Sequence, residues 1–312
     1  MKDIKCFDTF VKIEPINKGK SGDKKYRIET AAGEKLLLRV SDAGKLERKK
    51  IEYGMLKRAS ALDINLSVPV DFGIFNDGKS VYQLIKWVEG DDLESVFPDL
   101  SDAERYAFGL KAGGLLKKIH TLQAPKGAEP WDTWFYRKVQ ENIGYYATSP
   151  IKSEGGDLVI RYLREKKFLL AGRSQTFNHG DCNRTNLIVM PNGEIGVIDF
   201  DCYNKDKDHG DPWYEFIPMN WVGAADPYFC TGMLNGYFGG GPPRIFFEVF
   251  AYYLTYDALA VLCESFMNGE PENGAGHLAD ILSWTNNLEN IVPTWYLQAF
   301  AGRSVRNQQE TQ

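Results

Sequence analysis

The N-terminal part of the chain, up to about residue 90, alternates between runs of β-forming side chains and short clusters of Gly and polar residues. Such alternation is typical of strands joined by tight turns, and one stretch with helical spacing of its apolar residues interrupts it. The predicted strands are residues 9–16, 25–30, 34–40, 67–75 and 80–85, and the predicted helix is 45–61. Asn76-Asp77-Gly78 between the last two strands favours a hairpin turn. We therefore expect a small antiparallel sheet with one helix.

Helical periodicity dominates from residue 101 onwards. Ser101 and Glu104 form a capping-box pattern at the start of a helix that runs to about His120. His120 itself, at a helix end, is expected to be a buried structural partner rather than a catalyst. Further helical segments are predicted at residues 131–146, 156–171 and 244–267. The last of these is apolar on nearly every side, as expected of a helix buried among other helices.

One compact β unit interrupts the helical half. Residues 186–190 and 194–200 are apolar runs separated by Pro191-Asn192-Gly193, and Asn-Gly between apolar runs is a strong hairpin signal. The pattern as a whole predicts an α+β fold. We expect an N-terminal lobe over residues 1–86 and a mainly helical C-terminal lobe over residues 87–312.

Composition and charge exclude several classes of protein. The 312 residues carry a net charge of -5, whereas binding to nucleic acid requires clustered Lys and Arg in excess. No apolar run reaches the roughly 20 residues that span a bilayer, and the N-terminus does not resemble a signal peptide. The five cysteines are scattered, as is typical of reduced thiols. We expect a cytoplasmic protein without nucleic-acid or membrane partners.

Three polar residues around the predicted hairpin carry the chemistry. Asp181 lies five residues before Asn186, and Asp199 follows the second strand. On a loop, this spacing can direct the Asp carboxylate towards an acceptor hydroxyl and the Asn amide oxygen towards a metal ion, with the second carboxylate completing the metal site. Phosphoryl transfer needs these parts, because positioning, Mg²⁺ and a residue that orients the nucleophile supply most of its catalysis. The spacing predicts Asp181 as the base and Asn186 and Asp199 as metal ligands.

The pattern H-G-D-x-x-x-x-N at residues 179–186, followed by I-D-F-D at 198–201, resembles the aminoglycoside phosphotransferase and choline kinase superfamily. The resemblance spans most of the chain. It implies a protein-kinase-like fold of two lobes and a reaction that uses Mg²⁺ with ATP or GTP. His179-Gly180 in front of the Asp is similar to the small-molecule kinases rather than to the H-R-D of protein kinases.

The resemblance also implies nucleotide contacts in the N-terminal lobe. Ser21 and Gly22 lie in a turn between two predicted strands, where backbone N–H groups could cover phosphates. Arg39 stands where the family pattern has a phosphate-binding Lys, and Arg can neutralise phosphate with its fork of donors. Lys35 is the competing candidate, and we expect it to be a solvent-facing charge at the strand end.

Two further contacts follow from the same resemblance. Glu52 faces the apolar side of the predicted helix, where a carboxylate needs a partner, and pairing with Arg39 would hold the guanidinium over the phosphates. Residues 84–90 resemble the hinge between the lobes. The backbone at Ile85 and Trp87 would then hydrogen-bond the purine.

The distribution of charge along the chain bears on the class of acceptor. Between residues 201 and 273 the chain has eleven acidic and three basic residues, a local net charge of -8 against +3 for the remainder. Such asymmetry suits a cationic acceptor such as an aminoglycoside, although an acidic solvated face would give the same count. Asp201, Glu215 and Asp226 are the candidate acceptor contacts, and Glu215 stands where the family pattern G-D-P-x-x-D has Asp.

Three functions remain open from the sequence. The first is an antibiotic-type kinase, the second a metabolic kinase of choline, a sugar or an amino acid. The third is a catalytically inactive kinase-like binding protein, suggested by Arg39 and Glu215 in place of the usual residues. Retention of Asp181, Asn186 and Asp199 together argues against the third, because a binding protein needs neither base nor metal ligands.

Overall fold

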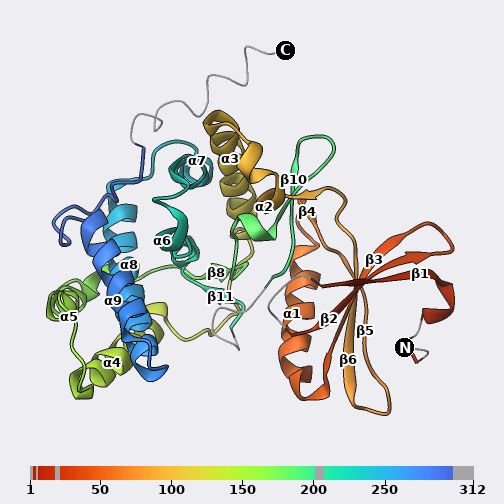
Figure 1. Ribbon diagram of the computed structural model, residues 1–312, viewed down its shortest axis with the longest axis horizontal. Helices are drawn as coiled ribbons and strands as arrows, with labels where there is room; N and C mark the ends of the chain where they lie inside the picture. Colours follow the sequence, from red (N-terminus) through yellow and green to blue (C-terminus); the bar gives the residue numbers. More distant parts are fainter. Residues whose placement is uncertain (1–2, 5, 18–21, 201–206, 298–312) are drawn as a thin grey trace. The chain divides into compact units, whose positions relative to one another are not determined.

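The computed structural model describes residues 3–4, 6–17, 22–200 and 207–297 (Figure 1). The chain divides into two compact units. The first, here called the sheet unit, comprises residues 1–99 and 179–208. The second, the helical unit, comprises residues 100–178 and 209–312.

The sheet unit contains most of the strands. Its elements are β1 Phe10–Ile16, β2 Lys24–Thr30, β3 Lys35–Asp42, α1 Leu46–Ala59, β4 Asn65–Leu66, β5 Pro69–Phe75, β6 Ser80–Lys86, β7 Asp91–Asp92, α2 Leu93–Val96, β9 Leu187–Val189 and β10 Ile195–Val197. The helical unit contains α3 Asp102–Ile119, α4 Trp131–Thr148, α5 Gly156–Glu165, β8 Thr176–Phe177, β11 His209–Gly210, α6 Met219–Val222, α7 Pro227–Phe238, α8 Arg244–Met267 and α9 Pro271–Trp284. Short 3-10 helices η1 to η6 cover Phe7–Thr9, Ala43–Lys45, Phe97–Asp99, Lys167–Leu170, Arg184–Asn186 and Pro212–Phe216. The predicted α+β class is confirmed.

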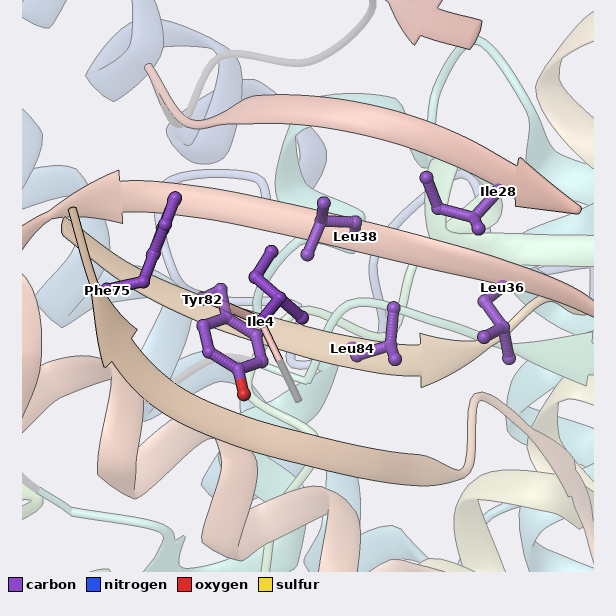
Figure 2. Packing of buried hydrophobic residues seen from close by; sticks show 7 residues of the cluster. All are labelled: Ile4, Ile28, Leu36, Leu38, Phe75, Tyr82 and Leu84. Atoms are coloured by element: carbon purple, nitrogen blue, oxygen red, sulfur yellow. The ribbon is translucent and has the colours of Figure 1, made fainter. Parts of the chain in front are cut away.

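The main sheet has the strand order β1-β2-β3-β6-β5, with every neighbouring pair antiparallel. One face buries an apolar cluster to which β3 contributes Leu36 and Leu38, with Ile28 and Leu84 from the flanking strands (Figure 2). Because side chains alternate along a strand, Arg39 projects from the opposite face. The register thereby keeps this cation out of the apolar cluster.

A second, smaller sheet explains why the compact units differ from the predicted lobes. In it β9 pairs with β7 and β10 pairs with β4, so the hairpin that follows the 179–186 segment joins strands near residues 65 and 91. The predicted boundary at residues 86 and 87 took each lobe as one continuous stretch. Strand pairing between distant segments instead places residues 87–99 and 179–208 with the N-terminal sheet.

The predicted turns and caps are present. Asn76 and Asp77 have positive φ angles of 57° and 52°, as the hairpin turn between β5 and β6 requires. Gly193 has φ 77° at the turn between β9 and β10. Ser101 and Glu104 form both hydrogen bonds of the capping box. The single helix predicted over 156–171 is wrong at its end: α5 stops at residue 165 and η4 follows, which buries Leu169 and Leu170 together.

Helix α8 is the central helix of the helical unit. Among the described residues, it is the helix whose length and composition alone would suffice to cross a membrane. It packs against α4, α5 and α9, with α9 running beside it (Figure 1). Burial among these helices accounts for its apolar surface on nearly every side, as predicted.

Helices α3 and α7 approach each other closely because glycines line their contact. A Cβ at Gly113 would lie 2.0 Å from the carbonyl oxygen of Met233, and one at Gly232 would lie 2.3 Å from that of Tyr106. Real Cβ atoms do not come so close to backbone oxygens. These positions therefore need glycine for space, not for an unusual backbone conformation.

We expect Gly113→Ala to lower the free energy of unfolding by about 1–3 kcal/mol, because the added methyl group forces α3 and α7 apart. Gly114→Ala is the matched control, since a Cβ there meets no atom within 4 Å. Alanine is the better helix former, so this variant should gain up to about 1 kcal/mol. Urea unfolding measures both. Equal effects of the two substitutions would contradict the close contact.

Candidate active site

Asp181 is held in place by two asparagine side chains of its own loop. Asn183 Nδ2 donates to Asp181 Oδ1 at 2.6 Å, and Asn186 Nδ2 donates to Oδ2 at 3.0 Å. The 3-10 turn at Arg184–Asn186 brings Asn186 back towards Asp181, whose backbone carbonyl it also contacts at 2.9 Å. The five-residue spacing thus closes the loop on itself, and the carboxylate orientation is fixed.

His179 joins this loop to the segment that carries Asp199. Its ring is fully buried, with Nδ1 accepting the backbone N–H of Asp181 at 3.2 Å. Nε2 lies 3.0 Å from the carbonyl oxygen of Ile198 and therefore acts as the donor to it. The ring also packs on Phe200, with 4.4 Å between ring centroids. The His of the H-G-D pattern is a structural link, a role the sequence analysis left unassigned.

The environment of Asp181 favours proton uptake. Burial raises the pKa of its carboxyl, and hydrogen bonds from Asn183 and Asn186 offset only part of that rise. A carboxylate with a raised pKa takes a proton more readily than an ordinary Asp. Fixed orientation and raised basicity are the properties of a general base.

Asn186 and Asp199 suit an oxygen-binding cation such as Mg²⁺. The Asn186 amide nitrogen is engaged with Asp181, so its Oδ1, which accepts no hydrogen bond from the described residues, is left for a metal ion. Asp199 has a positive φ of 62°, uncommon for a residue other than glycine, and its side chain is 38% exposed. The described residues contain no group of three or more His, Cys, Asp or Glu placed to hold a metal. Two oxygen ligands from the protein fit Mg²⁺, because phosphates and water commonly complete the coordination shell of this ion.

Arg39 forms an ion pair with Asp199 and a second one, at 3.3 Å, with Asp23. Burial alone would lower the pKa of the guanidinium, but Asp199, Glu52 and Asp23 outweigh it and raise the pKa. For Asp199, burial acts against the charge, yet Arg39 and Lys25 hold the pKa of this carboxyl below its usual value. Both groups therefore stay charged.

The predicted Arg39–Glu52 ion pair is wrong. Glu52 instead binds Lys49 at 2.7 Å and Arg48 at 3.0 Å, both on its own helix α1. Partners three and four residues away on a helix are neighbours, and they satisfy the carboxylate locally. Glu52 is thus removed from direct contact with Arg39.

Asp23 takes over the role expected of Glu52. Its side chain is 0% exposed and contacts Lys49 at 2.8 Å, Arg39 and Lys45 at 3.3 Å, and the hydroxyl of Ser41 at 2.8 Å. Burial would raise the pKa of Asp23, but hydrogen bonds from Lys49 and Ser41 outweigh it and keep the pKa well below the usual range. The sequence analysis missed Asp23 and Lys49, because an Asp in a polar turn gives no sign of burial.

A pocket lies between the two sheets of the sheet unit. Leu37 and Ile85 line it from the main sheet, Ile188 and Ile198 from the hairpin side, and Arg39 and Asp199 carry charge into it. An apolar slot with charged groups suits a flat aromatic base joined to phosphates. Lys35 is absent from the lining and pairs with Glu89 at 2.7 Å, as expected of a solvent-facing charge.

The other predicted nucleotide contacts are placed as follows. Ile85 and Trp87 both line the pocket, but the Trp87 N–H already donates to the Lys35 carbonyl at 3.0 Å. At Trp87, the carbonyl rather than the N–H is therefore the group that could bind a purine. Gly22 is exposed, with φ 70°, and is not part of the lining, whereas Ser21 lies outside the described residues.

Two of the three predicted acceptor contacts, Glu215 and Asp226, are buried. Glu215 is buried in the helical unit and lies 2.9 Å from Nε2 of His120, whose Nδ1 lies 2.9 Å from the Tyr237 hydroxyl. This confirms His120 as a buried structural partner and speaks against an acceptor contact by Glu215. Asp226, immediately before α7, is also buried, and Asp201 lies outside the described residues.

Several acids of the 201–273 stretch are neutralised by partners distant in the sequence. Asp211 is fully buried and binds both Nε and Nη2 of Arg173, at 2.5 and 3.0 Å, as well as the Tyr253 hydroxyl at 2.5 Å. Asp208 forms an ion pair with Arg58. The acidic excess of this stretch therefore overstates the negative charge open to a ligand.

Comparison with protein families and curated proteins gives one match and one absence. The sequence model of the phosphotransferase enzyme family, APH, matches residues 12–246. No curated protein matches the sequence.

Solved structures share the fold at low sequence identity. A thermostable mutant of aminoglycoside phosphotransferase APH(4)-Ia is 15% identical, with a TM-score of 0.61 and coverage of 89% of this chain and 96% of that one. The GDP complex of wild-type aminoglycoside 2'-phosphotransferase-IIIa is 14% identical, with a TM-score of 0.61 and coverage of 88% and 93%. Amicoumacin kinase hAmiN, in complex with AMP-PNP, Ca²⁺ and Ami, is 14% identical, with a TM-score of 0.57 and coverage of 92% and 91%. The likeness confirms the predicted kinase-like fold.

We expect Asp23→Asn to lower the free energy of unfolding at pH 7 by about 3 kcal/mol, because Arg39, Lys45 and Lys49 lose a buried counter-charge. The pKa of Asp23 is lowered in the folded state, so its stabilisation is fully present above about pH 4, the ordinary pKa of Asp, and is lost as the pH falls below it. The difference between wild type and variant should then shrink from pH 5 to pH 3 in urea unfolding. Asp77→Asn in the exposed β5–β6 turn is the control, and a difference for Asp23→Asn that stays constant with pH would contradict the buried ion pairs.

Proposed function

Because the chain belongs to the phosphotransferase enzyme family, we propose that it transfers the γ-phosphoryl group of a magnesium-bound ATP or GTP to a hydroxyl of a small molecule. A cationic acceptor such as an aminoglycoside is the first candidate. One observation carries the proposal: an Arg and a carboxylate line one pocket of the sheet unit, and His179 ties the loop with the fixed carboxylate and its Asn partner to the segment beside that pocket. These residues are Arg39 and Asp199 at the pocket, and Asp181 and Asn186 on the loop.

In this mechanism Asp181 orients the acceptor hydroxyl and takes its proton as the bond to phosphorus forms. Its two oxygens already accept hydrogen bonds from Asn183 and Asn186, so the carboxylate needs little reorientation on binding. The raised pKa supports proton uptake.

Asn186 Oδ1 and Asp199 would hold Mg²⁺, which when bound neutralises charge on the phosphates. Arg39 fixes Asp199 through their ion pair and presents its own positive charge to the pocket. Leu37, Ile188 and Ile198 would enclose the purine between apolar surfaces.

The acceptor class draws support from the similar structures, two of which are aminoglycoside phosphotransferases. The helical unit also has an exposed aromatic ring that could contact a cation. Trp221 is 58% exposed, and its ring stacks on His277 with 3.9 Å between centroids. Asp257 lies 3.1 Å from Nε2 of the same His277. The same Asp257 oxygen also accepts from Asn220, so the exposed indole of Trp221 is the member of this cluster most open to a cation.

A metabolic kinase of choline, a sugar or an amino-acid alcohol is the second candidate. It is favoured by the burial of Asp211, Glu215 and Asp226, which removes these acids from any acceptor surface. A neutral acceptor would need no excess of acidic residues.

The test is a coupled assay for nucleoside diphosphate release with ATP or GTP and a panel of aminoglycosides, macrolides, choline and sugars. We expect turnover that requires Mg²⁺ and is highest with a cationic acceptor. A best acceptor that is neutral would select the metabolic kinase. No transfer to any alcohol, although the protein binds nucleotide, would reject both candidates.

We expect Asp181→Asn to lower kcat by about 100- to 10,000-fold, because the amide keeps the shape of the carboxylate but cannot accept the proton. Nucleotide affinity should change less than about 2-fold, since the interaction is made in the transition state. Asp77→Asn in the same unit is the control. Wild-type turnover in Asp181→Asn would show that another group is the base.

For the nucleotide site, Arg39→Ala should weaken nucleotide binding by roughly 10- to 100-fold, the usual effect of losing hydrogen bonds to a charged group. Arg39→Lys should retain part of the affinity, because it keeps the charge but loses the planar fork that contacts Asp199 and Asp23 together. Titration calorimetry with ATP and Mg²⁺ measures both. Lys35→Ala is the matched control on the same strand, and a larger loss there would overturn the assignment.

A further inference from the structure

Lys25 is a half-buried lysine on β2 that lines the same pocket as Arg39 and Asp199. In the β2–β3 register it lies directly opposite Arg39. Opposite residues on neighbouring strands project from the same face of a sheet, so both cations face the pocket. The sequence analysis assigned no role to Lys25.

The charge balance of the two residues is unequal. Arg39 is compensated by ion pairs with Asp199 and Asp23. Lys25 forms no side-chain hydrogen bond or ion pair with any residue that the structure describes. Like charges directly opposite each other on adjacent strands repel, and no described carboxylate contacts Lys25 directly to relieve the repulsion. Burial, together with the nearby Arg39, lowers the pKa of the Lys25 ammonium, and the attraction of Asp199 and Asp23 offsets only part of that fall.

The neighbouring lysines do not share this situation. Lys45 and Lys49 are both engaged by Asp23, and Lys24, the preceding residue, is exposed and alternates to the other face of β2. Lys25 thus supplies the pocket with an ammonium group that forms no direct ion pair with a described residue and feels Asp199 and Asp23 only from a distance. An anion that enters the pocket would provide the counter-charge.

We infer that Lys25 is a second phosphate-binding cation, which holds the polyphosphate of a nucleoside di- or triphosphate together with Arg39. The inference rests on the proposed function. The two side chains would have different roles. The Arg39 guanidinium is held by two carboxylates, whereas the Lys25 ammonium is a compact charge with three donors on a flexible stem. Lys25 can therefore adjust to the phosphates while Arg39 stays in place.

The test compares binding of ATP and AMP in the presence of Mg²⁺ by titration calorimetry, with GTP and GMP if the wild type prefers guanine. Lys25→Gln should weaken ATP binding by roughly 10- to 100-fold and AMP binding much less, because the loss follows the number of phosphates. Lys24→Gln, on the opposite face, should stay within about 2-fold of wild type. Lys25→Arg should recover most of the ATP affinity.

Thermal unfolding without nucleotide separates this role from a structural one. Removing the repulsion with Arg39 should leave the Tm of Lys25→Gln equal to or above that of the wild type. Lys25→Met, which keeps the length of the stem, is the second neutral variant if the Gln variant does not fold. Unfolding of both neutral variants would show that Lys25 is structural and overturn the inference.

The outcomes also separate this inference from the proposed function. If the wild type binds ATP and transfers phosphate while Lys25→Gln binds ATP equally well, the inference alone fails. An equal loss for ATP and AMP would likewise overturn it, because the lysine would then contact base or ribose. A wild type that binds neither ATP nor GTP would overturn the proposed function and the inference with it.

Discussion

The ion pairs of Arg39 are the interaction on which the site depends. Through Asp199 they tie strand β3 to the segment after β10, and through Asp23 they tie it to the turn before β2. Asp199 in turn follows the segment that His179 binds, so the position of Asp181 is connected to Arg39 through the backbone at Ile198. Displacing Arg39 would therefore disturb Asp199, the proposed metal ligand, and the pocket, and through Ile198 it would also affect Asp181, the proposed base.

A buried cluster of this kind is poorly explained by stability alone. Removing charges from water costs several kcal/mol for each ion, and apolar replacements of similar volume are often as stable. Here Arg39 and Asp199 also line a pocket, and Lys25 adds a further cation beside them. Charges held ready at a pocket are preorganised for a charged ligand, which spares the reorganisation that water would require. The arrangement fits the proposed nucleotide substrate better than it fits the needs of folding alone.

The sequence predicted what is local and missed what depends on distant partners. Asp181 and Asn186 are five residues apart on one loop, and the capping box spans three residues, so spacing alone was informative. The predicted Arg39–Glu52 ion pair was wrong, because Glu52 pairs with Lys49 within α1. Arg39 pairs with Asp23 instead, and Lys49 contacts the same Asp23. The second sheet could not be foreseen either, since two-residue strands have no recognisable period.

The count of acidic residues has the same limitation, because it ignores distant partners, and this affects the prediction of the acceptor. The acids after residue 200 were counted without knowing that Arg173 neutralises Asp211 and His120 contacts Glu215. Buried acids attract a ligand little, because their field is already compensated by a neighbour. The acidic count therefore does not identify the acceptor, and the proposed function rests on the paired groups of the sheet unit. The acceptor would instead be selected by groups that solvent reaches, because such a group can exchange water for a ligand without first losing a protein partner.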